Sequence, residues 1–123
     1  MAFRVLLVED EGLIRLTLAE MLECAGYCVT EAVNGDDARA LLNGPHSFDV
    51  LLTDIQMPGK SDGIDVARDF HLKQPNSPVV FMTGRPDTLS RVGRLTASER
   101  LLRKPFAASQ MLAMLSSLLT QLA

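Results

Sequence analysis

The chain has 123 residues, of which 47% are hydrophobic and 22% are charged, and it contains no low-complexity tract. These values argue against disorder, and the length suits one domain that needs neither disulfides nor a structural metal. The net charge of −3 conceals an asymmetry, because residues 85–123 carry six basic and only two acidic side chains. Such a segment can attract an acidic partner. Without interleaved aromatic residues it does not indicate a nucleic-acid partner.

No segment suits a bilayer span or a signal peptide. A long uncharged stretch at residues 106–123 contains Ser, Thr and Gln and falls just short of a bilayer span. The apolar run near the N-terminus meets three acids at residues 9–11, too early for a signal peptide. We therefore expect a cytoplasmic protein with no membrane partner. Cys24 and Cys28 lack the further ligands of a zinc site, and we expect both to be buried as small hydrophobic residues.

Five short apolar runs predict strands. They cover residues 4–8, 27–33, 48–53, 78–82 and 100–103, and their near-continuous hydrophobicity is typical of strands buried on both faces. A helical pattern follows each run. Strict alternation with short connections predicts an α/β fold, in which helices cover both faces of a parallel sheet through right-handed crossovers.

The five expected helices differ in the clarity of their signals. The first carries an apolar stripe and stops at Gly26, the second is capped by Asn34 and ends at Gly44, and the third ends before Pro75. The apolar stripes of the first and third are formed by Ile14, Leu18, Met21, Leu22 and Ala25, and by Ile64, Ala67, Phe70 and His71. The fourth, roughly 87–95, is short and weakly patterned, and the last spans residues 107–122.

Polar side chains follow the carboxyl ends of four of the expected strands. Glu9 and Asp10 follow the first strand, Asp54 the third, Thr83 the fourth and Lys104 the fifth. Open parallel sheets bind ligands at this edge, so we expect these side chains to meet there. Three neighbouring carboxylates ionise together only around a cation, and hard oxygen ligands indicate Mg²⁺. Lysine and threonine suit a phosphate, which makes Asp54 the candidate nucleophile of a phosphoryl site.

Four motifs, LLVEDE, LLTDIQMPG, VVFMTG and LLRKPF, occur in an order and at a spacing that resemble the response-regulator receiver domain of two-component signalling. The resemblance covers the whole chain and is closest in kind to chemotaxis-type single-domain receivers. It implies a flavodoxin-like, doubly wound sheet of five parallel strands in the order 2-1-3-4-5, with five helices. Residues 1–123 would then form one receiver domain with no output domain.

The resemblance also implies the chemistry of the site. Asp54 would take a phosphoryl group from the phosphohistidine of a histidine kinase or phosphotransfer protein and later lose it by hydrolysis. Asp10, Asp54 and the backbone carbonyl of Gln56 would bind Mg²⁺, for which Mn²⁺ can substitute, and Glu9 would help through a water molecule. The chain would catalyse only its own phosphorylation and dephosphorylation, so we do not expect an enzyme in the wider sense.

Further roles follow from the same resemblance. Lys104 would pair with Asp54 and then with the phosphate, Thr83 would bond the phosphate oxygens, and Lys104-Pro105 would be a cis peptide. Gln56 and Arg85 would flank the attacking water and tune the lifetime of the phosphate. Leu101 stands where receivers usually place an aromatic switch residue, which puts that part of the coupling in doubt.

The expected output face joins the fourth helix, the fifth strand and the last helix, and would bind a protein target or a second copy of the chain. The last helix carries no charge and has a wide apolar stripe, which favours either a well-buried core helix or a docking surface. The stripe consists of Met111, Leu112, Met114, Leu115, Leu118, Leu119 and Leu122. Nearby arginines at 91, 94, 100 and 103 could steer an acidic partner.

Other interpretations stay open or are disfavoured. The chain could be a receiver excised from a hybrid kinase or larger regulator, or a scaffold that works without phosphorylation. A small phosphatase would need an acid where Gln56 stands, and a flavodoxin-type binder a Gly/Ser/Thr-rich loop at residues 9–11. His46 and His71 lack the partners of a triad or a metal site, so neither is assigned a catalytic role.

Overall fold

In the computed structural model, which describes residues 2–85 and 93–120, five parallel strands form one sheet. The strands are β1 (Arg4–Val8), β2 (Cys28–Ala32), β3 (Val50–Asp54), β4 (Val79–Thr83) and β5 (Glu99–Arg103). Their order across the sheet is β2-β1-β3-β4-β5, and every neighbouring pair is parallel. The predicted sheet and its order are confirmed.

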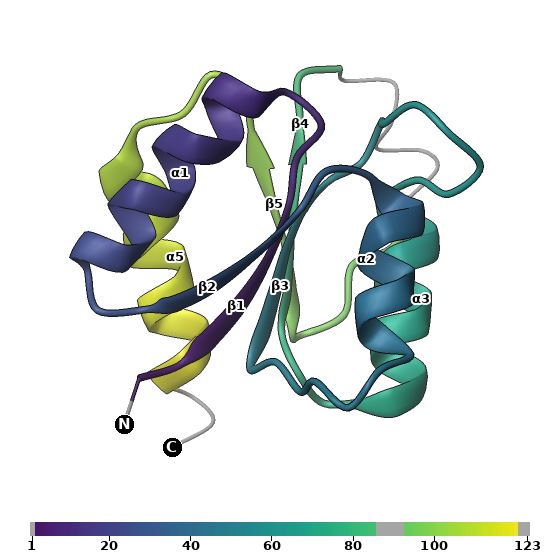
Figure 1. Ribbon diagram of the computed structural model, residues 1–123. Coiled ribbons are helices and arrows are strands. Elements are labelled where there is room, and N and C mark those ends of the chain that lie inside the picture. The colour runs from purple at the N-terminus through teal and green to yellow at the C-terminus, as the bar shows by residue number, and fades with distance from the viewer. Residues whose placement is uncertain (1, 86–92, 121–123) are drawn as a thin grey trace.

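Helices cover both faces of the sheet. Figure 1 shows α1 (Gly12–Cys24) and α5 (Ala108–Thr120) on one side, and α2 (Gly35–Leu42) and α3 (Gly63–Lys73) on the other. The helix expected at 87–95 falls largely on residues 86–92, which lie outside the described residues. Its expected end is wrong, because residues 93–95 are not helical and Gly93 has a φ of 73°, a value that favours glycine.

Side chains of each central strand alternate between two hydrophobic clusters. Val5 and Leu7 of β1 pack in the cluster beneath α1 and α5, whereas Leu6 and Val8 pack beneath α2 and α3. β3 and β4 follow the same alternation. All of these side chains are buried, because helices cover both faces of a parallel sheet. The sheet is therefore a rigid support for the residues at the carboxyl ends of its strands.

Local capping fixes where two helices begin. The Asn34 side chain accepts a hydrogen bond of 2.8 Å from the Asp37 amide and caps α2 as predicted. α3 begins with a capping box that the sequence analysis did not assign. There the Asp62 carboxylate accepts from the Asp65 amide, and the Asp65 carboxylate accepts from the Asp62 amide.

Several burial predictions for the first helix are wrong. Met21 and Ala25 were placed in the core stripe, but both are exposed. Cys24 and Cys28 were expected to be buried, and both are exposed as well. Met21, Cys24 and Ala25 lie in or just after the last turn of α1, and Cys28 is the first residue of β2, an edge strand of the sheet, so all four lie at the margin of the core.

The apolar stripe of α5 belongs mainly to the core. Met111, Leu115, Leu118 and Leu119 are buried, and two further stripe residues, Leu112 and Met114, are partly buried against the same cluster. The core interpretation of this helix is thus the one that the structure favours; Leu122 lies outside the described residues. Within the described ranges, no helix combines the length and hydrophobicity that a bilayer crossing requires.

Candidate functional site

Three charged side chains from three strand ends meet at the carboxyl edge of the sheet. The Lys104 ammonium, which follows β5, donates hydrogen bonds of 2.8 Å to Glu9 Oε1 and 3.2 Å to Asp54 Oδ2. Glu9 follows β1 and is only 1% exposed, and Asp54, the last residue of β3, is 8% exposed. One ammonium thus lies between two buried carboxylates.

This arrangement separates the pKa values of the two carboxyl groups. Burial acts to raise the pKa of Glu9, but the hydrogen bond and charge of Lys104, together with hydrogen bonding to the neighbouring Asp54 and Asp10, outweigh it, so the pKa of Glu9 lies below its usual range. Burial, reinforced by the negative charge of Glu9, raises the pKa of Asp54 to about 7. The closer partner of Lys104 therefore stays ionised, while Asp54 holds a proton near neutral pH whenever no further cation is present.

The pKa of Lys104 itself is raised. Burial acts to lower it, but the ion pairs with Glu9 and Asp54 outweigh burial. Lys104 therefore carries a full positive charge at neutral pH.

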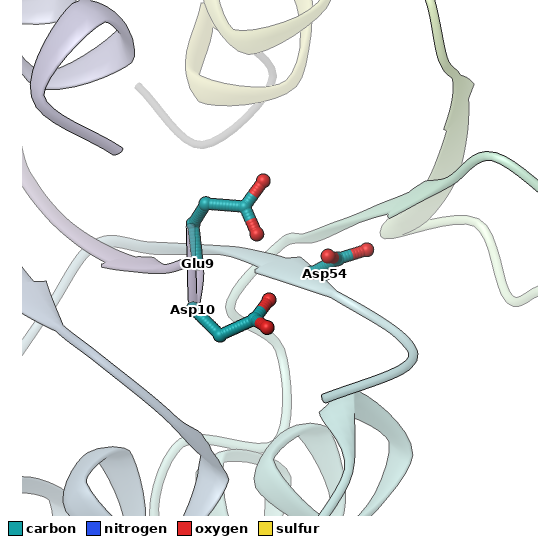
Figure 2. Close-up of side chains that lie close together, drawn as sticks. All are labelled: Glu9, Asp10 and Asp54. Carbon is teal, nitrogen blue, oxygen red and sulfur yellow. The ribbon is translucent and has the colours of Figure 1, made fainter. Parts of the chain in front are cut away.

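Asp10 completes an acidic cluster with Glu9 and Asp54. One carboxylate oxygen from each of the three lies within 4.8 Å of the others, and Figure 2 shows their carboxylates converging from two strand ends. Glu9 Oε2 is buried and has no hydrogen-bond partner among the residues that the structure describes. A buried acceptor without a donor is costly, and a hard divalent cation with its waters would satisfy it. The donor set fits Mg²⁺.

A cavity of about 560 Å³ opens beside Asp54. It is lined by Asp54, Gln56, Met57, Pro58, Thr83, Gly84, Arg85 and Lys104. The Thr83 hydroxyl, on a residue only 4% exposed, donates to the Arg85 carbonyl at 3.1 Å and accepts from the Arg85 amide at 3.0 Å. The predicted residues Gln56, Thr83 and Arg85 therefore face the same space as Asp54 and Lys104.

The connection after Asp54 is anchored to the sheet at both ends. The Ile55 amide donates to the Met82 carbonyl at 3.0 Å, and the Gly63 amide donates to the Ile55 carbonyl at 2.8 Å. A Cβ on Gly63 would lie 2.1 Å from the Asp54 carbonyl oxygen, so only glycine fits there. The connection that contains Met57-Pro58-Gly59 thus begins and ends beside the backbone of Asp54 and Ile55.

Two other predicted residues lie next to the site without joining the acidic cluster. The Lys104–Pro105 peptide is cis, and Pro105 lines a smaller cavity with Thr83 and Arg103. Leu101 is half-buried against the cluster beneath α2 and α3.

A second concave surface, which the sequence analysis missed, adjoins the site. This α1 groove has a volume of about 610 Å³ and is lined by Leu13, Ile14, Thr17, Leu18, Met21, Lys104, Pro105, Phe106 and Ala108. Leu13 is 81% exposed and the neighbouring Leu16 is 54% exposed. These leucines lie outside the core stripe of α1, and that surplus of apolar residues is the signal that could have revealed the groove.

Among protein families, the response regulator receiver domain matches residues 5–116. The chain belongs to this family. Receiver domains form the input half of two-component response regulators and bind Mg²⁺ at an acidic pocket, which corresponds here to the acidic cluster at Glu9, Asp10 and Asp54.

Curated relatives of this receiver domain include two regulators of Bacillus subtilis. YrkP of Bacillus subtilis, named an uncharacterized transcriptional regulatory protein, is 38% identical over 112 residues, which cover 90% of this chain and 47% of YrkP. The transcriptional regulatory protein ResD of the same organism is 33% identical over 117 residues, covering 94% of this chain and 48% of ResD. The chain spans about half the length of these relatives.

Solved structures agree on the fold. A response regulator receiver protein from Sinorhizobium medicae superposes with a TM-score of 0.89 at 31% identity, covering 97% of this chain and 95% of that one. The chemotaxis protein CheY4 of Vibrio cholerae gives a TM-score of 0.83 at 26% identity, covering 96% and 99%. The expected receiver fold is confirmed.

Proposed function

We propose that Asp54 of this receiver domain accepts a phosphoryl group from the phosphohistidine of a histidine kinase or phosphotransfer protein. The observation that carries the proposal is the position of its carboxylate, 3.2 Å from the Lys104 ammonium and within the acidic cluster. Among the described residues that line its cavity, Asp54 is also the only acid. The Asp54 carboxylate is therefore a nucleophile that lies beside the Lys104 ammonium and faces a cavity open to solvent.

In the transfer step an Asp54 carboxylate oxygen attacks phosphorus on the side opposite the phosphorus–nitrogen bond. The new phosphorus–oxygen bond forms as the phosphorus–nitrogen bond breaks, and the electron pair stays on the imidazole nitrogen, which takes a proton from solvent. Lys104 lies beside the attacking carboxylate and would donate to the phosphoryl oxygens. Phosphoryl transfer needs little more than such positioning and charge neutralisation.

The residues around Asp54 would also bind a divalent cation, some directly and one through water. Asp10, Asp54 and the backbone carbonyl of Gln56 would hold Mg²⁺ or Mn²⁺, with Glu9 acting through a water molecule. When bound, the ion neutralises negative charge on the transferring phosphoryl group. Because the pKa of Asp54 is about 7, a cation that displaces its proton also makes the carboxylate nucleophilic at neutral pH.

Return to the resting state would follow by hydrolysis of the acyl phosphate. Gln56 and Arg85 border the cavity and would flank the attacking water. The Thr83 hydroxyl, which bonds the Arg85 backbone in this state, would turn to the phosphate and release that contact. The change would pass to β5 and α5, whose outer surface would bind a protein target or a second copy of the chain, with Leu101 replacing the usual aromatic residue.

The α1 groove supports a protein as the phosphoryl donor. Lys104 lines both the groove and the cavity beside Asp54, so a helix lying on α1 would reach the site. The exposed side chains of Leu13 and Leu16 offer the apolar contact area that a small phosphodonor would not use.

The test is incubation with acetyl phosphate and Mg²⁺ followed by intact-mass measurement. The wild-type chain should gain the mass of one phosphoryl group, and Asp54→Asn should gain none. Chelation of the metal should suppress the gain. An unlabelled wild-type chain would instead favour a scaffold that acts without phosphorylation, and equal labelling of Asp54→Asn would place the acceptor elsewhere.

A further inference from the structure

The connection between Asp54 and α3 is held near its C-terminal end by two side chains of α2, Asp36 and Arg39. The Ser61 hydroxyl donates a 2.7 Å hydrogen bond to Asp36 Oδ1 and accepts a 2.9 Å hydrogen bond from the Arg39 guanidinium. A guanidinium can only donate, so the single hydroxyl proton of Ser61 is directed to Asp36. Ser61 is 1% exposed, whereas its partners Asp36 and Arg39 lie at the surface, so the hydroxyl end of both bonds is buried.

The second oxygen of Asp36 reaches the backbone of the same connection. Asp36 Oδ2 accepts from the Lys60 amide at 3.4 Å. Gly59 allows this contact through a φ of 105°, and a Cβ on Gly59 would lie 3.1 Å from Asp36 Oδ2. The hydrogen bond from Ser61, followed by that from Lys60, lowers the pKa of Asp36, so its carboxylate is ionised at neutral pH.

The same contacts join three segments of the chain. Arg39 donates a further 2.7 Å bond to Asp69 of α3, so α2, the connection and α3 are linked through one guanidinium. The backbones also touch, because a Cβ on Gly35 would lie only 2.2 Å from the Ser61 carbonyl oxygen. Figure 1 shows α2, α3 and the end of β3 meeting at the carboxyl edge of the sheet, where the acidic cluster also lies.

We propose that Asp36, Arg39 and Ser61 form a latch that presets the backbone of residues 55–62 and thereby sets the affinity of the acidic cluster for Mg²⁺. The inference rests on the proposed function, in which the Gln56 carbonyl is a ligand. A backbone carbonyl has no side chain to orient it, so its direction depends on how the whole connection is held. Mg²⁺ tolerates little deviation from octahedral geometry, and a looser connection would bind it more weakly. These three are positioning residues, because none of them belongs to the acidic cluster.

Ser61→Ala is the sharpest variant, because it removes both hydroxyl bonds without changing the net charge. Mg²⁺ would be titrated by isothermal calorimetry in the absence of any phosphodonor. We expect an affinity about tenfold below that of the wild type, the usual cost of removing a group that orients a metal ligand. Asp36→Asn should give a smaller loss, because its one remaining oxygen can still accept from Ser61 or Lys60, and the double variant should be little worse than Ser61→Ala, since the two changes share the Ser61–Asp36 bond.

Lys73→Met provides the matched control for general loosening of α2. The Lys73 ammonium donates to the carbonyls of Leu42, Gly44 and His46, at and beyond the C-terminal end of that helix, and contacts none of the three latch residues. The variant should lower stability while leaving the Mg²⁺ affinity within about twofold of the wild type. Hydrogen exchange of the Lys60 amide should speed up in Ser61→Ala and Asp36→Asn but not in Lys73→Met.

The outcomes separate the two proposals. A wild type that binds Mg²⁺ and gains a phosphoryl group, with latch variants of unchanged affinity, overturns the latch and leaves the proposed function standing. Equal loss of affinity in Lys73→Met also overturns it, because general destabilisation would then explain the effect. A wild type that neither binds Mg²⁺ nor gains a phosphoryl group overturns the proposed function, and the latch with it.

Discussion

The cavity beside Asp54 and the α1 groove share Lys104 but are built from opposite materials. The cavity gathers an acid, a hydroxyl and two cations, whereas the groove is formed mostly by aliphatic side chains of α1 and the ring of Phe106. Charged groups held at fixed positions perform bond chemistry, and exposed apolar groups provide contact area for a partner. The comparison indicates that the cavity beside Asp54 carries out the chemistry, whereas the α1 groove binds the partner protein. We call these two surfaces the reactive side and the recognising side of Lys104.

Replacement of Lys104 should have the largest effect on the reactive side. In Lys104→Met the transferring phosphoryl group loses the positively charged ammonium beside it, and labelling by acetyl phosphate should slow by about 100-fold. Buried Glu9 also loses its partner, so the free energy of unfolding in denaturant at pH 8 without Mg²⁺ should fall by about 3 kcal/mol. Arg68→Gln, which removes an exposed cation on α3, should change neither value noticeably. A labelling rate that survives in Lys104→Met would contradict the assigned role.

The pH dependence of stability tests the reactive side without any phosphodonor. The pKa of Asp54 is about 7 in the folded chain and near 3.8 when unfolded, so the folded state binds the extra proton between these values. The free energy of unfolding of the metal-free chain should therefore rise by about 2 kcal/mol as the pH falls from 8 to 5. Glu9, whose pKa is lowered, opposes this trend only below its ordinary value of 4.5.

Two controls accompany that measurement. Asp54→Asn should remove most of the rise, because it removes the titrating carboxyl group. Saturating Mg²⁺ should flatten or reverse it, since the cation competes with the proton at Asp54. Denaturant melts at several pH values would show both. A wild-type curve that already falls steadily from pH 8 to 5 without metal would mean that Asp54 is not held in the way the structure indicates.

The recognising side is tested by two leucines of nearly equal exposure. Leu13 in the α1 groove is 81% exposed, and Leu72 of α3, on the other face of the sheet, is 80% exposed. Leu13→Ser should slow phosphoryl transfer from a cognate phosphohistidine protein about tenfold, while labelling by acetyl phosphate stays unchanged. Leu72→Ser should match the wild type with both donors. If both variants slow transfer equally, the groove has no special part in docking the donor.

The smallest effect is expected outside both regions. Cys24 and Cys28 are exposed and contribute to neither the cavity nor the α1 groove. Replacing both with serine should change the free energy of unfolding by less than about 0.5 kcal/mol and leave the labelling rate unaltered. A loss of several kcal/mol would restore the original prediction that they are buried.

The reactive side could be predicted from sequence because its signals are local. Each charged residue directly follows an apolar strand, and the rule that parallel strands end at one edge brings Glu9, Asp54 and Lys104 together. The sheet was predictable for the same reason. Strands that are buried on both faces appear in the sequence as uniform apolar runs, and here these runs alternate with helical patterns. Sequence alone did not predict that Glu9 is buried. Nor did it predict that Lys104 lies closer to Glu9 than to Asp54.

The recognising side could not be predicted, because its signals are not local in the sequence. Whether Leu13, Met21 or Cys24 is covered depends on how α1 lies against the sheet and α5, and periodicity does not give that placement. The latch was missed because Asp36 and Ser61 are 25 residues apart and each alone suits a helix start or a turn. Long-range polar contacts of this kind become visible only once the chain is folded.

The central claim is that Asp54 is the phosphoryl acceptor, and peptide mapping tests it most directly. The wild-type chain would be labelled with acetyl phosphate and Mg²⁺, digested under conditions that preserve acyl phosphates, and sequenced by mass spectrometry. We expect one phosphoryl group, attached to Asp54. A phosphoryl group on any other residue, with Asp54 unmodified, would contradict it.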